Sequence, residues 1–361
     1  MCRWALYFLG GIAIFIAGCA PSSSDKLARV LWPPPPDQPR LEFIGVYHNE
    51  YDFEQTLLQR VAVAIAGKTK PQSFKSPFGI VADGEGHVWV SDIHAKNLRI
   101  YDFDERKVRF FFKRAIFSTP AAMDLDESGY LYVADTAANK IFTFSQSGKP
   151  GVVISDPTHL GKPSGVAVSR SLGRIYVSDG IGGKVVVFDL KGNYLFEFGR
   201  STKEAGGLYS PQGLALDRDG NVFVCDMLNA RMMVFDKDGG FVRTFGERGD
   251  QVWQFVSPKD CAFDSQNNLY IVDSRSANLL IYTPEGRLLL ALGEGKASVH
   301  PLGFGAPSSI FIDKNDRIYV ADIIDRRFSV YQFLTPEYLK KNPIRPEEMD
   351  ALWDLVGAEN E

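Results

Sequence analysis

A five-residue phrase returns six times along this chain of 361 residues. Each copy reads aliphatic, aromatic, aliphatic, small residue or Val, then Asp, and the copies end at Asp92, Asp135, Asp179, Asp226, Asp273 and Asp322. These aspartates are separated by 43, 44, 47, 47 and 49 residues. A period of about 40–50 residues is the signature of one supersecondary unit stacked end to end. The spacing therefore limits the chain to a repeat architecture.

Each repeat contains four short strand-like runs and no segment of helical periodicity. A proline opens an apolar run such as 211–217, and a turn of Asp, Gly and Asn residues leads from it into the phrase. Two further apolar runs follow, as at 232–236 and 241–246 in the fourth repeat. Turn residues of this kind join antiparallel strands. The pattern predicts an all-β fold in which six four-stranded antiparallel blades close into a six-bladed β-propeller.

The composite repeat resembles the NHL repeat over residues 76–332. The fourth repeat carries the resemblance best, with Pro211, Gly213, Asp217, Gly220, Asn221, Asp226, Asn229, Arg231, Phe235, Asp236, Gly239, Phe245 and Gly246. The resemblance implies that the aspartate closing each phrase is structural. We expect it to pair with the Asn or Arg of the following loop, as Asp226 with Asn229 and Arg231.

The ends of the ring need a closing strand, because the sixth repeat lacks its fourth run. An isolated extended segment at 41–47 precedes the first repeat, and we expect it to supply the outer strand of the last blade. The propeller then spans 41–333 and includes an amphipathic helix at 52–66. A helical tail follows at 334–361. We expect both helical segments to pack on the rim, with partner docking as the alternative.

The start of the chain reads as a targeting segment. Residues 1–18 have a basic start and an apolar core, and 16–19 resemble the lipobox of bacterial lipoproteins, in which Cys19 would be lipidated. A Ser/Pro-rich tether is expected at 19–40. We expect the protein to be exported and anchored by its lipid to the bacterial cell envelope, and Ala20 favours the outer membrane. An ordinary secretory signal or a short membrane anchor is the alternative.

Two cysteines give information on the redox state of the compartment, and the net charge gives information on the kind of partner. Cys225 and Cys261 fall in neighbouring blades, where they could form a disulfide in an oxidising compartment or remain two buried thiols. The net charge of −4 does not suggest a broad nucleic-acid footprint. We therefore expect a membrane association through the lipid and no nucleic-acid partner.

No catalytic signature stands out in the chain, so no catalytic residue and no cofactor are assigned. Propeller lyases of the peptidylglycine lyase and streptogramin lyase families use His with a metal ion. A weaker alternative is therefore a metal site made by His94, His159 and His300, which all fall in loops of one face. The scattered positions of these histidines do not support their convergence.

The loops after each phrase and between blades share one face of a propeller and differ from blade to blade. Variable loops on a rigid scaffold are where such folds place recognition. The binding candidates there are His94, Lys96, Lys184, Arg231, Arg275 and Arg326. The sequence thus favours a membrane-tethered binding or scaffold protein for an envelope protein or surface polymer. The alternatives are a metal-dependent lyase or hydrolase and a small-ligand sensor, both using the central channel.

Overall fold

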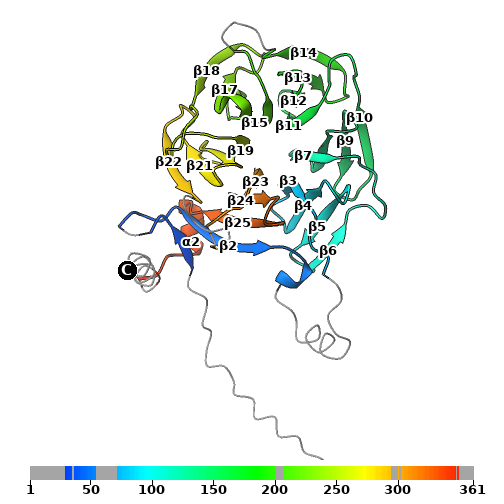
Figure 1. Ribbon diagram of the computed structural model, residues 1–361. Coiled ribbons are helices and arrows are strands. Elements are labelled where there is room, and N and C mark those ends of the chain that lie inside the picture. The colour runs from blue at the N-terminus through cyan, green and yellow to red at the C-terminus, as the bar shows by residue number, and fades with distance from the viewer. Residues whose placement is uncertain are drawn as a thin grey trace, which may run out of the picture.

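The structure is a computed structural model that describes residues 29–34, 36–53, 71–200, 206–293, 300, 302–346 and 348. Six antiparallel sheets surround one axis, as the repeat period predicts, and the fold is a six-bladed β-propeller (Figure 1). The signal 1–18, Cys19, most of the expected helix at 52–66, and residues 347 and 349–361 of the expected helical tail lie outside the described residues.

Five blades each contain four consecutive strands. Blades one and two consist of β3 (Pro77–Ala82), β4 (His87–Asp92), β5 (Asn97–Asp102), β6 (Lys107–Phe110), β7 (Pro120–Leu125), β8 (Tyr130–Asp135), β9 (Lys140–Ser145) and β10 (Pro150–Ile154). Blade three consists of β11 (Pro163–Ser169), β12 (Arg174–Asp179), β13 (Lys184–Asp189) and β14 (Tyr194–Phe198). Blades four and five consist of β15 (Pro211–Leu216), β16 (Val222–Asp226), β17 (Arg231–Phe235), β18 (Phe241–Phe245), β19 (Pro258–Phe263), β20 (Leu269–Asp273), β21 (Asn278–Tyr282) and β22 (Leu288–Leu292).

The sixth blade is assembled from both ends of the chain. Its inner strands are β23 (Pro307–Ile312), β24 (Arg317–Asp322) and β25 (Arg327–Phe333). The segment expected to close the ring forms β2 (Leu41–Tyr47), which pairs antiparallel with β25 from Leu41 opposite Phe333 to Tyr47 opposite Phe328. In Figure 1, β2 runs along the outside of this blade. Pairing of distant segments leaves no open edge at β25.

A fifth strand lies outside β2 and has no counterpart among the four strands predicted for each blade. Residues Val30–Trp32 form β1, antiparallel to β2, so this part of the expected tether at 19–40 is hydrogen-bonded to the propeller. Leu31 is buried beside Leu334, and the Trp32 indole N–H donates to the Ala291 carbonyl of blade five at 3.0 Å. The apolar side chains of this short segment therefore pack on the ring despite the prolines that follow.

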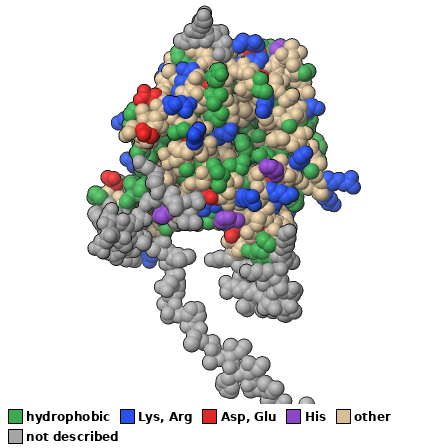
Figure 2. Space-filling view, viewed as in Figure 1, with side chains coloured by type: hydrophobic (Ala, Val, Ile, Leu, Met, Phe, Trp, Pro, Cys, Tyr) green, Lys and Arg blue, Asp and Glu red, His purple; other side chains and the backbone are tan. Residues whose placement is uncertain are grey.

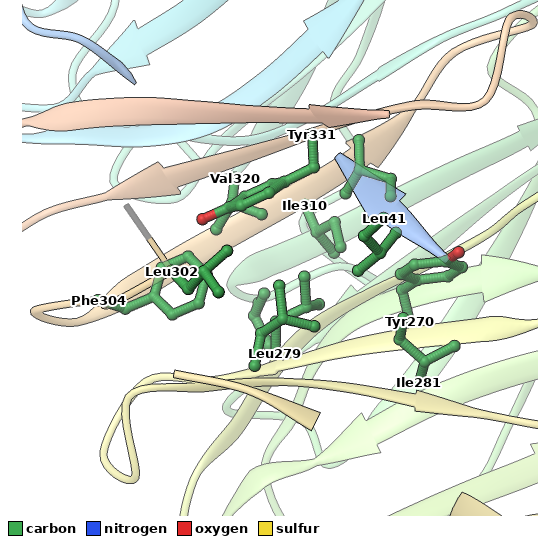
Figure 3. Packing of buried hydrophobic residues seen from close by; sticks show 12 residues of the cluster. Leu41, Tyr270, Leu279, Ile281, Leu302, Phe304, Ile310, Val320 and Tyr331 are labelled. Atoms are coloured by element: carbon green, nitrogen blue, oxygen red, sulfur yellow. The ribbon is translucent and has the colours of Figure 1, made fainter. Parts of the chain in front are cut away.

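The core lies between adjacent blades. Figure 3 shows one such layer, where Leu41 of β2 points toward Tyr270 and Ile310 in a cluster shared by blades five and six. Both Tyr270 and Leu41 are almost completely buried. Because each sheet contributes one face to such a cluster, the ring is held together by apolar contact at its blade boundaries.

A clasp joins the two ends of the described chain. The Arg29 guanidinium donates to both Glu42 oxygens at 2.8 and 2.5 Å, and the Tyr338 hydroxyl donates to the same carboxylate at 3.0 Å. Tyr338 lies on α2 (Pro336–Lys341), whose N-terminus is capped by the Thr335 side chain and begins with a proline. The described residues include no helix long and apolar enough to cross a membrane.

Glycine explains how the innermost strands approach one another around the axis. A Cβ on Gly213 would lie 2.6 Å from Cα of Asp260, and one on Gly79 would lie 2.3 Å from the Ala121 carbonyl oxygen. Neither separation is a possible Cβ contact, so in blades one and four the glycine two positions after the proline lets the next blade approach closely. The same approach brings the residue between proline and glycine to the mouth of the channel.

Candidate functional site

The aspartates that close the phrase fix the loops of one face. Asp92 accepts hydrogen bonds from the backbone N–H groups of Lys75 and Ser76, just before β3, and from Ala95 in the following loop. The corresponding aspartate of every blade accepts from the segment that enters its own first strand. We call this end of the ring the loop face: loops 93–96, 136–139, 180–183, 227–230, 274–277 and 323–326, with the segments entering the first strands.

In blade four the expected pairing is present. Asp226 accepts from the Asn229 amide at 2.7 Å and from the Arg231 guanidinium at 3.1 Å, and also from the backbone of Tyr209 and Ser210. The carboxylate is completely buried. A carboxylate with this many internal donors is a structural group, because no acceptor position is left for a ligand.

The basic candidates on the loop face divide into two sets. His94, Lys96, Arg275 and Arg326 are exposed there. Lys184 is instead buried, and its ammonium donates to Glu197 of β14 at 2.5 Å. Arg231 bonds to Asp226 and to the Gly207 carbonyl. These last two side chains belong to the scaffold rather than to a binding surface.

The three candidate histidines each contact a different part of the ring. The His94 ring lies 2.5 Å from the Ser76 hydroxyl, while His159 stacks on Tyr194 of β14 with ring centroids 3.7 Å apart. The His300 ring accepts from the Leu302 N–H at 3.0 Å. Within the described part of the chain no three His, Cys, Asp or Glu side chains are arranged to hold a metal ion. The structure therefore does not bring the three histidines together as a site.

Cys225 of β16 and Cys261 of β19 are buried in one cluster between blades four and five, and both are free thiols. Burial raises the pKa of the Cys225 thiol, and the neighbouring Cys261 side chain raises it further. Such thiols behave as small apolar side chains rather than as nucleophiles.

Exposed apolar side chains, none of them among the predicted binding residues, project from the loop face. Ile181 is 76% exposed, Ile324 68%, Tyr209 61% and Leu228 53%. Among the described residues these are the four most exposed large apolar side chains, and all four lie on this face. The view of the ring in Figure 2 also shows green hydrophobic surface interspersed with blue Lys and Arg side chains. The face combines apolar and basic groups, which is typical of a binding surface.

The centre of the loop face opens into the channel. The residues that follow the first-strand prolines come together there, and we call them the mouth ring: Phe78, Ala121, Ser164, Gln212, Lys259 and Ser308. All of them except Ser308 line a cavity of about 300 Å³. Ile93, Ile181 and Lys162 also line it. The cavity is thus built from one variable position of the repeat and from the neighbouring loops.

Lys259 is the central polar group of this mouth. Its ammonium donates to the Gln212 amide oxygen at 2.6 Å and lies 5.3 Å from the ring centroid of Phe78. Burial lowers the pKa of Lys259, an effect that the neighbouring Asp260 partly offsets. Ser164 and Thr136 line the same cavity. The Ser164 hydroxyl donates to the Pro211 carbonyl and the Thr136 hydroxyl to the Pro163 carbonyl.

Deeper in the channel, acidic side chains take the place of the basic ones at the mouth. Asp124 and Asp260 line a second cavity of about 330 Å³. Burial raises the pKa of Asp124 to about 7 and that of Asp260 to about 6. Each carboxylate accepts a backbone N–H from the next blade, Val168 at 2.8 Å for Asp124 and Ile310 at 3.1 Å for Asp260. These carboxylates therefore have a structural role, because they accept hydrogen bonds from backbone N–H groups at the inner edge of the neighbouring first strand.

Comparison with known proteins gives the same fold. Residues 213–290 match the family model DUF5128, described as "6-bladed beta-propeller". The amidating monooxygenase named "Peptidyl-glycine alpha-amidating monooxygenase" in Mus musculus is 29% identical over 115 residues, which are 28% of this chain and 12% of that protein. A "Probable peptidyl-alpha-hydroxyglycine alpha-amidating lyase" of Caenorhabditis elegans is 29% identical over 128 residues, 32% of this chain and 36% of that protein. The chain thus matches only a minor part of either relative.

Solved propellers align over more of the chain at lower identity. A protein of unknown function from Bacteroides thetaiotaomicron has a TM-score of 0.62 at 18% identity, over 72% of this chain and 70% of its own. Virginiamycin B lyase from Staphylococcus aureus has a TM-score of 0.54 at 14% identity, over 72% and 96%. A gluconolactonase from Xanthomonas campestris has a TM-score of 0.57 at 15% identity, over 72% and 87%. Likenesses at this identity define the propeller fold alone.

Proposed function

We propose that this chain is an exported, lipid-anchored propeller that binds another protein of the cell envelope through its loop face. The four highly exposed apolar side chains of that face carry the proposal. Single exposed apolar residues are ordinary on protein surfaces, but their collection at one end of a ring is a property of interaction sites. The lipobox-like segment at 16–19 supports the anchoring.

A protein partner fits this surface better than a surface polymer does. Ile181, Ile324 and Leu228 offer no hydrogen bond, whereas burial of their side chains against apolar protein surface is favourable. The exposed Lys96, Arg275 and Arg326 add positive charge around them. Basic rims of this kind steer association and set specificity, while apolar anchors supply most of the binding energy.

Co-purification from envelopes of cells that produce the tagged full chain tests this proposal. Substitution of Ile181 and Leu228 together by Asp should reduce recovery of the bound protein about tenfold or more, because two charges would be desolvated on docking. Val242→Asp is the matched control, since Val242 is 51% exposed on the outer strand β18 of the same blade as Leu228. Equal recovery with all three chains would overturn the proposal, and so would recovery of a polysaccharide alone.

A metal-dependent lyase or hydrolase in the channel is the second candidate, and the name of the nematode relative, a probable lyase, favours the lyase. His94, His159 and His300 do not fit as its ligands, because each contacts a different part of the ring. Metal analysis of the purified protein separates the two functions. Stoichiometric zinc or calcium would favour the enzyme.

A further inference from the structure

We propose that the channel mouth is a binding site for a carboxylate group attached to a small apolar body, held by Lys259. The site lies within the mouth ring at the centre of the loop face. It does not depend on the proposed protein partner, because the cavity is formed within one chain. Four features of the mouth support it: the incomplete hydrogen bonding of the Lys259 ammonium, the absence of acids from the described cavity lining, the apolar side chains of that lining and the size of the cavity.

Lys259 carries a charge whose internal pairing is incomplete. An ammonium has three N–H donors, and here its partners are the neutral Gln212 amide oxygen and the face of Phe78. Within the described residues it forms no ion pair with a carboxylate. Holding a half-buried ammonium this way is unfavourable, since a buried charge needs an opposite charge or several hydrogen bonds. A ligand carboxylate would supply both.

The lining of the cavity is basic at this end of the channel, and the one carboxylate whose charge acts on the ammonium, that of Asp260, lies outside this lining. Lys162 also lines the cavity, and none of the described residues lining it is an acid. Asp260 follows Lys259 directly, but its carboxylate is turned to blade six, where the Ser309 hydroxyl donates to it at 2.6 Å. An anion entering the mouth therefore meets positive charge first, and the acids Asp124 and Asp260 lie in the cavity beneath.

The remaining lining selects for an apolar body on the ligand. Phe78, Ile93, Ala121 and Ile181 present carbon surface, whereas the hydroxyls of Ser164 and Thr136 already donate to backbone carbonyls. A volume of about 300 Å³ lies at the lower limit of small-molecule pockets. The combination of one cation with apolar walls is the usual composition of a site for an amphipathic acid.

Titration followed by saturation-transfer NMR tests the inference on the full chain in detergent. Phenylacetate should bind to the wild-type protein, and its uncharged analogue phenylacetamide should bind about tenfold more weakly or not at all. Lys259→Met keeps the length of the stem and removes the charge, so it should weaken phenylacetate binding about tenfold. Lys191→Met, at an exposed lysine between β13 and β14, is the control and should bind as the wild type does.

The same experiment separates a free acid from the terminal carboxylate of a polypeptide. A short peptide ending in leucine with a free carboxylate is compared with its C-terminal amide. A peptide acid that binds tenfold tighter than phenylacetate would assign the site to polypeptide ends, whereas equal or weaker binding would assign it to small acids. Both outcomes support recognition of a carboxylate with an apolar body.

Three results would overturn the inference: equal binding of phenylacetate and phenylacetamide, unchanged binding to Lys259→Met, or no binding of any of these acids at tens of millimolar. Thermal unfolding of the Lys259→Met protein checks that it is folded, and removal of a half-buried charge should not lower its midpoint. Leu228→Asp should leave acid binding unchanged. A failure of this inference is therefore distinct from a failure of the protein-docking proposal.

Discussion

Each phrase-ending aspartate holds two loops of its own blade together. Asp226 shows the arrangement most fully, because its buried carboxylate accepts two backbone N–H groups, one amide and one guanidinium. A protein interior leaves few buried donors unpaired, and removal of a common acceptor leaves several at once. This explains why the residue recurs in all six repeats.

Substitution of Asp226 by Ala should lower the free energy of unfolding by about 3 kcal/mol, because two backbone N–H groups, the Asn229 amide and the half-buried Arg231 guanidinium lose their acceptor. Chemical denaturation monitored by tryptophan fluorescence measures the change. Asp219→Ala is the control at an exposed turn position of the same blade, and it should change stability by less than about 0.5 kcal/mol. Equal stabilities of the two variants would contradict the structural role.

At this scale the sequence predicts the repeated residues well and the variable ones poorly. The pairing of Asp226 with Asn229 and Arg231 follows from the repeat. Lys184 was a wrong choice as a binding residue, because only the fold shows its ammonium beside Glu197. Lys259 was missed, although its signal was present: the residue after each first-strand proline differs in chemistry from blade to blade while the proline does not.

The closing strand β2 completes the last blade and so closes the propeller. β2 covers the open edge of β25, and Glu42 ties it to Arg29 and to Tyr338 of α2. The pairing joins residues almost 300 positions apart, so it orders both ends of the chain together. An unpaired edge of this length would otherwise be exposed to association with other chains.

Replacement of Glu42 by Ala should reduce the free energy of unfolding by about 2 kcal/mol, because Arg29 and Tyr338 both lose their hydrogen bonds to this carboxylate. Arg29 then keeps only its longer ion pair with Glu348, at 3.6 Å. Glu85→Ala removes the exposed ion pair with Lys314 and should cost less than about 1 kcal/mol. Thermal or denaturant unfolding compares the two. A Glu42→Ala protein as stable as the Glu85→Ala protein would argue against the clasp.

The position of β2 could be read from the sequence because the sixth repeat lacks a strand and 41–47 has no local partner. β1 could not, since three residues before a proline run give no periodicity to detect. Its place depends on Leu31, which packs against Leu334 and residues of α2, and on Trp32, which packs against the apolar cluster between blades five and six. Tertiary contact, and not local propensity, determines that strand.

The whole molecule presents two ends of different chemistry. The loop face carries exposed apolar side chains and the basic mouth with Lys259, whereas the channel below it is lined by Asp124 and Asp260. The period of the repeat is sufficient to predict the ring and the side on which the variable loops lie. It does not show which loop side chains point outward, because exposure of Ile181 or Leu228 depends on the conformation of each loop.

The most direct test of the docking proposal is site-specific photo-crosslinking in the native envelope. A photoreactive side chain placed at Leu228 should give one discrete adduct with a protein, and the same group at Val242, of nearly equal exposure on β18, should give none. The comparison isolates the face, because both positions belong to blade four and both substitutions are on the surface. Adducts from Val242 but not from Leu228 would contradict the assignment of the loop face as the binding surface.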